Sequence, residues 1–289
     1  MIAVFDGNYL LHRAFHASIR MYKIEHLRKN ALTSFLSGVF SISTEFRATH
    51  LIVCFDGAHS FRKDIDPRYK ANRYAKTTVK NHLGDEVETL ETPGGLVKDA
   101  KKILDSYGVY YIHKKRFESD DTMAGAVTNT SKKCVIVTRD KDLAGMVDDR
   151  VSLYWPVEKR IITPKEVVEH YGVTPSQIRD YLCLLGDKVD NIEGIKGWGE
   201  KTVQKFLKEH GTIKKALETK EGRYRLMPHK KIIFLSKKLV TLDLSTVPDY
   251  TASKYRETKE ETDLIWRSPK SFEEYLNVMH KPKVKGLYR

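Results

Sequence analysis

Several short apolar runs of the sequence are each followed by an aspartate. Asp6, Asp56 and Asp140 occupy such positions, and Asp142 follows two residues after Asp140. If the runs are parallel strands, their carboxyl ends meet at one edge of the sheet, in the crevice where such sheets bind ligands. We therefore expect these carboxylates to lie close together. For any one of them taken alone, a helix cap or a turn is the alternative.

Further carboxylates are predicted to reach the same edge. Glu118, Asp120 and Asp121 begin a predicted helix after another strand, while Asp187 and Asp190 follow a later helix. Carboxylates packed together without cations repel one another and raise one another's pKa values. Divalent cations relieve this repulsion, and all-oxygen ligand sets select Mg²⁺ or Mn²⁺. Two such ions, about 3.5–4 Å apart, hold the attacking and leaving oxygens of a phosphodiester in an in-line displacement.

The composition points to a polyanionic partner. The 289-residue chain has a formal net charge of +13 and a hydrophobic content of 40%, enough for a packed globular protein. Phosphate backbones attract lysine and arginine through counterion release, so nucleic acid is the favoured partner. Acidic small substrates and a merely solubilising role are the alternatives.

A glycine-rich segment at 194–202 is a candidate for phosphate binding. Glu200 stands where a P-loop requires its lysine, and no strand precedes the segment, so a P-loop is excluded. A tight turn between two helices remains, with backbone N–H groups that can hold the phosphates of one duplex strand. A plain turn without a ligand is the alternative.

Residues 62–95 are densely charged and show no strand pattern, so we expect a long mobile insertion. Its cations and tyrosines are interleaved, which suits single-stranded nucleic acid because phosphates meet the cations and bases stack on the rings. A solvated charged face is the alternative. The residues concerned are Arg62, Lys63, Arg68, Tyr69, Lys70, Arg73, Tyr74, Lys76 and Lys80.

Strands and helices are expected to alternate through the first part of the chain. Continuous apolar strands separated by helices predict an α/β fold, with a mostly parallel sheet covered by helices on both faces. The helices are expected near 10–20, 31–47, 95–107 and 119–130. The strands are expected at Ile2–Phe5, Leu51–Phe55, Val109–Ile112, Cys134–Thr138 and Val151–Trp155, with Arg160–Thr163 closing a hairpin.

Beyond Thr163 the strand pattern ends. Two domains are predicted: an α/β core at 1–163 and a helical subdomain at 164–289, which ends in a basic tail. Pro164, Pro175 and Pro228 fit first-turn positions of its helices. The cysteines match neither zinc nor disulfide spacing, and the sequence shows no signal peptide or membrane-spanning run, so a cytoplasmic protein is expected.

Five motifs resemble those of the 5′-nuclease family, which includes flap endonucleases, stand-alone bacteriophage 5′–3′ exonucleases and the 5′-nuclease domain of bacterial DNA polymerase I. They occur in family order over roughly residues 1–245. The motifs are FDGNYLLHRAFHA at 5–17, FDGAHSFRKDIDPRYKANR at 55–73, ESDDTMAGAV at 118–127, TRDKDL at 138–143 and GDKVDNIEGIKGWGEKT at 186–202.

The resemblance implies a PIN-like nuclease core, a helical arch and a C-terminal helical duplex-binding subdomain with a helix-turn-helix at about 176–210. It also implies two Mg²⁺ ions, for which Mn²⁺ can substitute, and a K⁺ ion at the helix-turn-helix. The first metal group would be Asp6, Asp56, Glu118 and Asp120 with Asp121 beside it. The second would be Asp140, Asp142 and Asp190, with Asp187 a further member.

Basic and polar residues complete the implied site. Arg13 matches the arginine of the first motif, while Lys70 and Arg73 match basic residues of the arch and would neutralise charge on the scissile phosphate. DNA contacts are expected from Arg62, Tyr69, Gly194, Gly197, Trp198, Gly199, Lys201 and Thr202.

The functional hypothesis is a monomeric, structure-specific 5′ nuclease of DNA replication or repair, acting on 5′ flaps, nicks and overhangs. Two alternatives from other classes remain. One is a DNA-binding protein with a degenerate site, and the other is a small-molecule phosphatase, which the pair Asp140 and Asp142 suggests.

Overall fold

The computed structural model describes residues 1–21, 26–72, 78–80, 86–88 and 92–254 of the chain. Residues Met1–Lys254 form one compact unit. The predictions that concern Arg73, Tyr74, Lys76 and the basic tail lie outside the described residues. Among the described helices, none combines the length and the apolar character that a membrane span requires.

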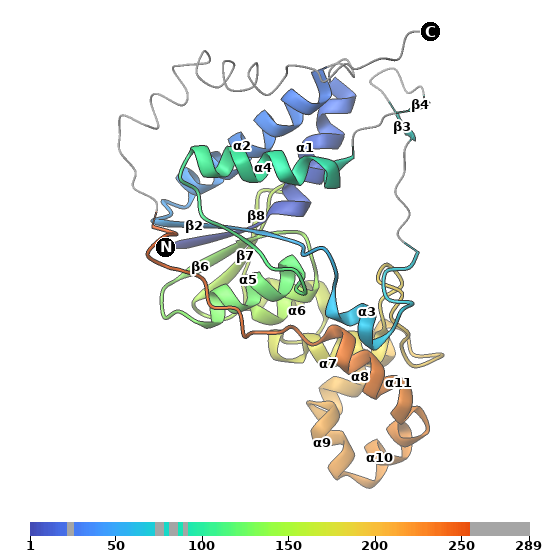
Figure 1. Ribbon diagram of the computed structural model, residues 1–289. Helices are drawn as coiled ribbons and strands as arrows, with labels where there is room; N and C mark the ends of the chain where they lie inside the picture. Colours follow the sequence, from blue (N-terminus) through green and yellow to red (C-terminus); the bar gives the residue numbers. More distant parts are fainter. Residues whose placement is uncertain (22–25, 73–77, 81–85, 89–91, 255–289) are drawn as a thin grey trace. The chain divides into compact units, whose positions relative to one another are not determined.

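A six-stranded sheet forms the centre of the fold (Figure 1). All neighbouring strands are parallel except the last pair, which is an antiparallel hairpin as the sequence predicted. The central strands are wholly buried because helices cover both faces, which explains their continuous apolar sequences. In spatial order the strands are β5 (Tyr111–His113), β2 (His50–Phe55), β1 (Ile2–Asp6), β6 (Cys134–Val137), β7 (Val151–Trp155) and β8 (Arg160–Ile162).

The order of the strands creates a switch point beside β1. The chain proceeds from β1 outward to β2 and β5, and then returns to the other side of β1 to form β6 and β7. The connections on the two sides of β1 therefore lie on opposite faces of the sheet and leave a crevice between the carboxyl ends of β1 and β6. This crevice is where the sequence places Asp6 and Asp140.

Helices cover the sheet on both sides. On one side lie α1 (Gly7–Met21), α2 (Leu27–Glu45) and α4 (Pro93–Ser106), and on the other lie α5 (Ser119–Thr128) and α6 (Pro164–Tyr171) (Figure 1). In α4 the buried positions Leu96, Ala100, Ile103 and Leu104 recur every three or four residues, as one face of a helix requires. The helices predicted for this part of the chain are confirmed.

The insertion differs from its prediction. Its first part is packed rather than mobile: Ser60 caps the short helix α3 (Phe61–Ile65), and a turn through Asn72 follows. Two short strands, β3 (Thr78–Lys80) and β4 (Glu86–Glu88), form an antiparallel pair where no strand was expected. The described residues between 73 and 91 therefore contribute strands rather than an arch helix.

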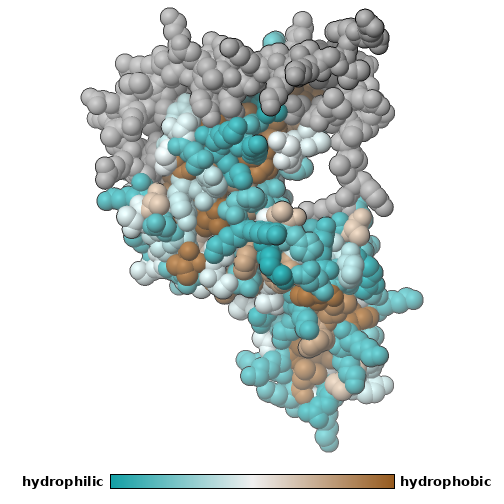
Figure 2. Space-filling model, in the orientation of Figure 1, coloured by the Kyte–Doolittle hydropathy of each residue, from teal (hydrophilic) through white to brown (hydrophobic). Residues whose placement is uncertain are grey.

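The C-terminal part is helical, as predicted, and Pro164, Pro175 and Pro228 all occupy first-turn positions. Its buried core includes Val203, Phe206 and Leu207. Polar side chains surround apolar ones over these helices in Figure 2. The elements are the 3₁₀ helices η3 (Pro175–Gln177) and η4 (Met227–His229) and the helices α7 (Ile178–Leu185), α8 (Glu200–His210), α9 (Ile213–Glu218), α10 (Lys220–Leu226) and α11 (Lys230–Val240).

After α11 the chain returns to the α/β core. Asn129, at the end of α5, donates to the carbonyl oxygens of Leu244 and Thr246, and the amide of Leu51 in β2 donates to the carbonyl of Ser253. Residues 241–254 are therefore a strap that ties the helical part back to the sheet.

Candidate active site at the carboxyl edge of the sheet

Asp6 and Asp140 lie on either side of the switch-point crevice and share a hydrogen-bond partner. Thr138 donates from its hydroxyl to Asp6 Oδ2 at 2.8 Å and accepts from the Asp140 amide at 3.1 Å. The Tyr9 amide, in the first turn of α1, donates to Asp6 Oδ1 at 2.9 Å. Asp142 begins the 3₁₀ helix η2 (Asp142–Met146), and its amide donates to Asp140 Oδ1 at 2.9 Å. These contacts fix the carboxylates of two neighbouring strands.

Asp56 is held against the amino end of α5. The Ser119 amide and hydroxyl donate to Asp56 Oδ1 at 2.8 and 2.9 Å. The Asp56 amide in turn donates to Asn8 at 2.9 Å, so α1, β2 and α5 meet at this point. Glu118 is the N-cap of α5 and Asp120 lies in its first turn. The positive end of the helix dipole stabilises carboxylates in such positions.

Asp187 and Asp190 come from a tight loop after α7. The backbone groups of Asp187 and Ile192 exchange two hydrogen bonds, of 2.8 and 2.7 Å. Gly186 has a φ of +78°, and a Cβ on Gly194 would lie 2.1 Å from the carbonyl oxygen of Leu185. The two glycines therefore permit the close approach of chain segments that brings this loop back to the sheet edge.

The carboxylates of the two predicted metal groups lie close enough to repel one another and to raise one another's pKa values. Burial, with repulsion from Asp56 and Asp140, raises the pKa of Asp6 from its usual 3.8 to about 7. Burial also raises the pKa of Asp120, and repulsion from Asp140 and Asp6 adds to the effect. The pKa of Asp142 is raised for the same reasons, with repulsion from Asp140, Asp190 and Asp187. These carboxylates come from distant parts of the sequence and, as expected, lie in one cluster.

Two lysines form ion pairs with the cluster. Lys70 Nζ lies 2.8 Å from Glu118 Oε1 and 3.5 Å from Asp190 Oδ2, and Lys141 Nζ lies 3.1 Å from Asp187 Oδ2. Burial alone would lower the pKa of Lys70, but attraction to Glu118 and Asp190 outweighs it and the pKa is raised. Lys70 therefore stays protonated within the site.

Asp121 differs from the other predicted ligands because it is fully buried beside Arg62. Its Oδ1 accepts from Arg62 and from the Asp243 amide, and its Oδ2 accepts from Arg62 and from the Glu118 amide. Four donors thus occupy the carboxylate. The expectation that Asp121 is a metal ligand does not fit these surroundings.

Arg62 and Tyr69 also differ from their predicted place on a surface insertion. Their exposed fractions are 2% and 3%. The Tyr69 hydroxyl donates to Glu118 Oε2 at 2.8 Å and lies 3.3 Å from Asp190 Oδ2. Neither side chain is accessible to DNA, so the expectation of direct DNA contact does not fit. Arg13 lies on an exposed part of α1, as a phosphate contact requires.

The glycine-rich segment forms the turn between α7 and α8, as predicted. Gly199 is the N-cap of α8, so the amides of Lys201 and Thr202 lie in the first turn of that helix, where N–H groups are available to anions. Gly197 has a φ of +83°, and a Cβ placed on it would meet no atom within 4 Å among the described residues. Trp198 is half-buried, its ring 5.0 Å from that of Phe206 and 5.1 Å from the Arg225 guanidinium.

Three residues that organise the site were not predicted from the sequence. Thr138 links Asp6 to Asp140, Ser119 holds Asp56, and Lys141 pairs with Asp187. Thr138 and Lys141 lie close to predicted ligands in the sequence, and Ser119 lies between Glu118 and Asp120. Their positions inside the acidic motifs were therefore the available signal.

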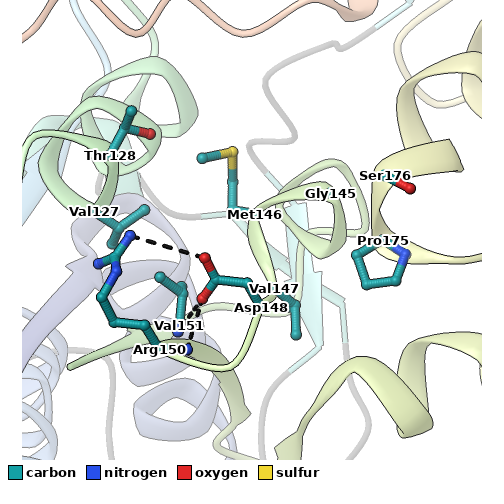
Figure 3. Close-up of a pocket in the computed structure, with 10 residues that line it drawn as sticks. All are labelled: Val127, Thr128, Gly145, Met146, Val147, Asp148, Arg150, Val151, Pro175 and Ser176. Carbon is teal, nitrogen blue, oxygen red and sulfur yellow. Dashed lines mark hydrogen bonds and ion pairs between the residues drawn. The ribbon is translucent and has the colours of Figure 1, made fainter. Parts of the chain in front are cut away.

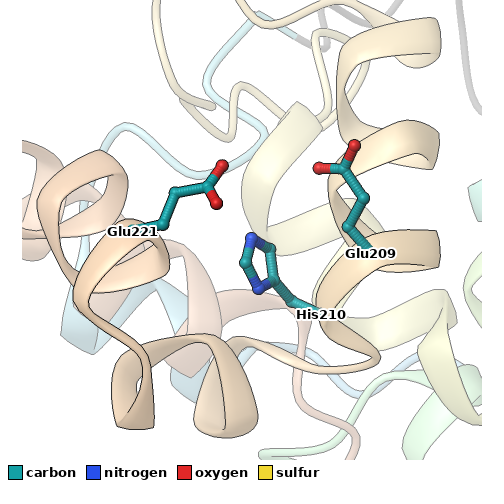
Figure 4. Close-up of side chains that lie close together, drawn as sticks. All are labelled: Glu209, His210 and Glu221. Atoms are coloured by element: carbon teal, nitrogen blue, oxygen red, sulfur yellow. The ribbon is translucent and has the colours of Figure 1, made fainter.

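Two other features lie apart from this cluster. A cavity of about 360 Å³ opens between the end of α5, η2, the start of β7 and η3, where Arg150 pairs with Asp148 (Figure 3). It contains none of the predicted site residues. On α8 and α10, Glu209, His210 and Glu221 approach one another (Figure 4). Arg225 lies 3.5 and 3.8 Å from the two glutamates, so an internal cation already offsets their charge.

The fold and the cluster define an α/β protein with a carboxylate-lined switch point. The profile described as "5′-3′ exonuclease, N-terminal resolvase-like domain" matches residues 1–172, and the profile "5′-3′ exonuclease, C-terminal SAM fold" matches residues 173–263. The chain therefore belongs to the 5′–3′ exonuclease family, which confirms the resemblance found in the motifs.

Named relatives agree with this assignment. The chain is 31% identical over 245 residues to a 5′–3′ exonuclease of Aquifex aeolicus, covering 83% of this chain and 80% of that protein. It is 32% identical over 227 residues to DNA polymerase I of Mycobacterium tuberculosis, covering 75% of this chain and 24% of the polymerase. The chain thus spans about a quarter of the length of that polymerase.

The fold has a close counterpart among solved structures. It is similar to the bacteriophage T5 5′-exonuclease with bound divalent zinc ions, with a TM-score of 0.69 and 23% identity, over 84% of this chain and 89% of that chain. At this level of identity the likeness concerns the fold, which is a resolvase-like α/β domain with a helical C-terminal domain.

Proposed function

We propose that this chain is a metal-dependent 5′ nuclease that hydrolyses DNA phosphodiesters near junctions of single strand and duplex, as in 5′ flaps, nicks and overhangs, during replication or repair. The observation that carries the proposal is the carboxylate cluster at the switch point, because its crowded, mutually repelling side chains require cations. Family membership and the net charge of +13 support DNA as the substrate.

The donor chemistry of the cluster fits hard divalent cations. Carboxylate oxygens suit Mg²⁺ or Mn²⁺, and the raised pKa values of Asp6, Asp120 and Asp142 show that burial and mutual repulsion disfavour their ionised forms, which a bound cation would stabilise. Cations bound here would activate water and stabilise the leaving oxygen of a phosphodiester. The proposed ligands are Asp6, Asp56, Glu118 and Asp120 in one group and Asp140, Asp142, Asp187 and Asp190 in the other.

Lys70 is proposed to neutralise charge on the scissile phosphate. Its ammonium group lies among the carboxylates, its raised pKa keeps it protonated, and a preorganised cation at this position stabilises negative charge that develops in the transition state. Arg13 and Arg73 are proposed as further phosphate contacts.

The first turn of α8 is proposed to hold the duplex. Open backbone N–H groups after Gly197 and Gly199, together with exposed Lys201, suit a phosphate backbone and carry no sequence preference. A K⁺ ion at this turn, which the resemblance implies, is part of the proposal.

A substrate comparison tests the proposal against its rivals. The protein is incubated in Mg²⁺ with a 5′-flap DNA labelled at its 5′ end, with a blunt duplex of the same sequence, and with p-nitrophenyl phosphate; EDTA is the control. We expect flap cleavage that releases 5′ fragments and stops in EDTA. Binding without cleavage would support a degenerate DNA-binding protein, and hydrolysis of the small ester alone would support a phosphatase.

A further inference from the structure

Arg62 is a buried arginine with a complete set of partners. Its Nε donates to the carbonyl of Leu239 at 2.7 Å, and Nη2 donates to the carbonyl of Thr241 at 3.1 Å. Nη1 and Nη2 both donate to Asp121 at 2.7 Å, and Nη1 also donates to Glu118 Oε2 at 3.2 Å. A guanidinium has five N–H groups, so none is left for a phosphate.

These bonds join three elements at one guanidinium. Arg62 belongs to α3, Asp121 and Glu118 belong to the amino end of α5, and Leu239 and Thr241 lie at the carboxyl end of α11. The carboxyl end of a helix carries partial negative charge, which favours a cation there. The fork-to-fork pair with Asp121 fixes both the position and the plane of the guanidinium.

The two oxygens of Glu118 are thereby distinguished. Oε2 accepts from Arg62 and from the Tyr69 hydroxyl, which lies at 2.8 Å. Oε1 accepts from Lys70 Nζ, the cation that reaches into the carboxylate cluster. Oε2 is thus held by two buried side chains, whereas Oε1 is bonded to Lys70, which also pairs with Asp190 of the cluster.

We infer that Arg62, acting with Tyr69, is a positioning residue that makes Glu118 a one-oxygen metal ligand by retaining Oε2 and presenting Oε1. The inference rests on the proposed function, because it takes Glu118 as a ligand. Mg²⁺ requires near-ideal octahedral geometry at about 2.0–2.1 Å, whereas Ca²⁺ accepts one or both carboxylate oxygens at about 2.3–2.6 Å. Fixing Glu118 in this way therefore favours Mg²⁺ over Ca²⁺.

Tyr69→Phe provides the mildest test, since it removes the hydroxyl that lies 2.8 Å from Glu118 Oε2 and 3.3 Å from Asp190 Oδ2 without changing charge or adding volume. Tyr250→Phe is the matched control, because its hydroxyl donates to the Ala126 carbonyl of the same helix α5, away from the cluster. Arg62→Lys, which keeps the charge but loses the fork, is compared with Arg150→Lys. Mg²⁺ and Ca²⁺ binding to the DNA-free proteins is measured by isothermal titration calorimetry, with thermal unfolding recorded alongside.

We expect Tyr69→Phe to weaken Mg²⁺ binding about tenfold, the effect of losing one hydrogen bond to a charged group, and Ca²⁺ binding less than about threefold. Arg62→Lys, where it folds, should lower the ratio of Mg²⁺ affinity to Ca²⁺ affinity further than Tyr69→Phe does. Tyr250→Phe should leave the ratio unchanged. Equal losses for both ions in Tyr69→Phe, or none, would overturn the inference. If wild-type protein binds Mg²⁺ but cleaves no flap DNA, the proposed function fails while this comparison still decides the role of Arg62.

Discussion

Asp6 makes the stability of the metal-free protein depend on pH in an unusual direction. Burial first, and then repulsion from Asp56 and Asp140, raises its pKa from 3.8 to about 7. The folded state therefore keeps a proton on Asp6 in a pH range where the unfolded chain has lost it. As the pH rises from about 4 to about 7, the folded state loses stability relative to the unfolded state.

The size of the effect follows from the two pKa values. A pKa difference of about 3 corresponds to about 4 kcal/mol, a large fraction of the stability of a typical domain. This loss is complete above about pH 7 and absent below about pH 4. A divalent cation bound to the cluster should offset it by binding the folded state.

The assay is urea unfolding in EDTA at pH 5 and pH 8, for wild-type protein and Asp6→Asn. Asparagine cannot ionise, but its Oδ1 can accept from the Tyr9 amide while its Nδ2 donates to the Thr138 hydroxyl oxygen, where Asp6 accepts from both groups. We expect wild-type protein to lose about 2–3 kcal/mol more than Asp6→Asn between the two pH values, because part of the effect is already present at pH 5, and Mg²⁺ at pH 8 to restore much of it. Asp105→Asn, at an exposed position, should behave as wild type. The same pH dependence in Asp6→Asn and in wild-type protein would refute the reasoning.

Three further predictions concern the rest of the site. Lys70→Ala should lower the single-turnover cleavage rate by about 10²–10³ with little change in duplex affinity; normal cleavage with weaker binding would make Lys70 a positioning contact. Gly194→Ala should destabilise the fold severely in thermal unfolding because its Cβ would meet backbone, whereas Gly199→Ala has open space; equal stability would contradict this. With the other tryptophans replaced by phenylalanine, Trp198 emission should change when duplex DNA is added in Ca²⁺, and the change should diminish as salt rises from about 50 to about 200 mM. Unchanged emission at saturating DNA would mean that the duplex binds elsewhere on the protein.

The sheet and the acidic cluster were predictable because their signals are local. The three central strands are short apolar runs that end at or shortly before an aspartate. β1 ends at Asp6, β2 ends one residue before Asp56, and β6 ends three residues before Asp140. Val151–Trp155 forms β7 as predicted, whereas β5 begins two residues later than expected. Val109 is instead used to close α4, since its amide donates to the carbonyl of Leu104.

The insertion could not be predicted because its partners are distant in sequence. A charged segment is most simply read as exposed, yet Arg62 is buried against Asp121, 59 residues away, and against Thr241, 179 residues away. The same pairing removes Asp121 from the candidate ligands, although the motif places it beside Glu118 and Asp120. The sequence shows that Arg62 is charged, but the partner that allows this charge to be buried is brought to it only by the fold.

The proposed metal site is tested most directly by single-turnover cleavage of a 5′-flap DNA in Mg²⁺ by Asp120→Asn and Asp142→Asn, with DNA affinity measured in Ca²⁺ and Asp105→Asn as control. Both side chains lie among carboxylates that we propose as metal ligands. We expect cleavage to be abolished in both variants while flap binding persists and the control cleaves normally. Retention of more than about a tenth of the wild-type rate by both variants, a barrier change below about 1.4 kcal/mol, would contradict it.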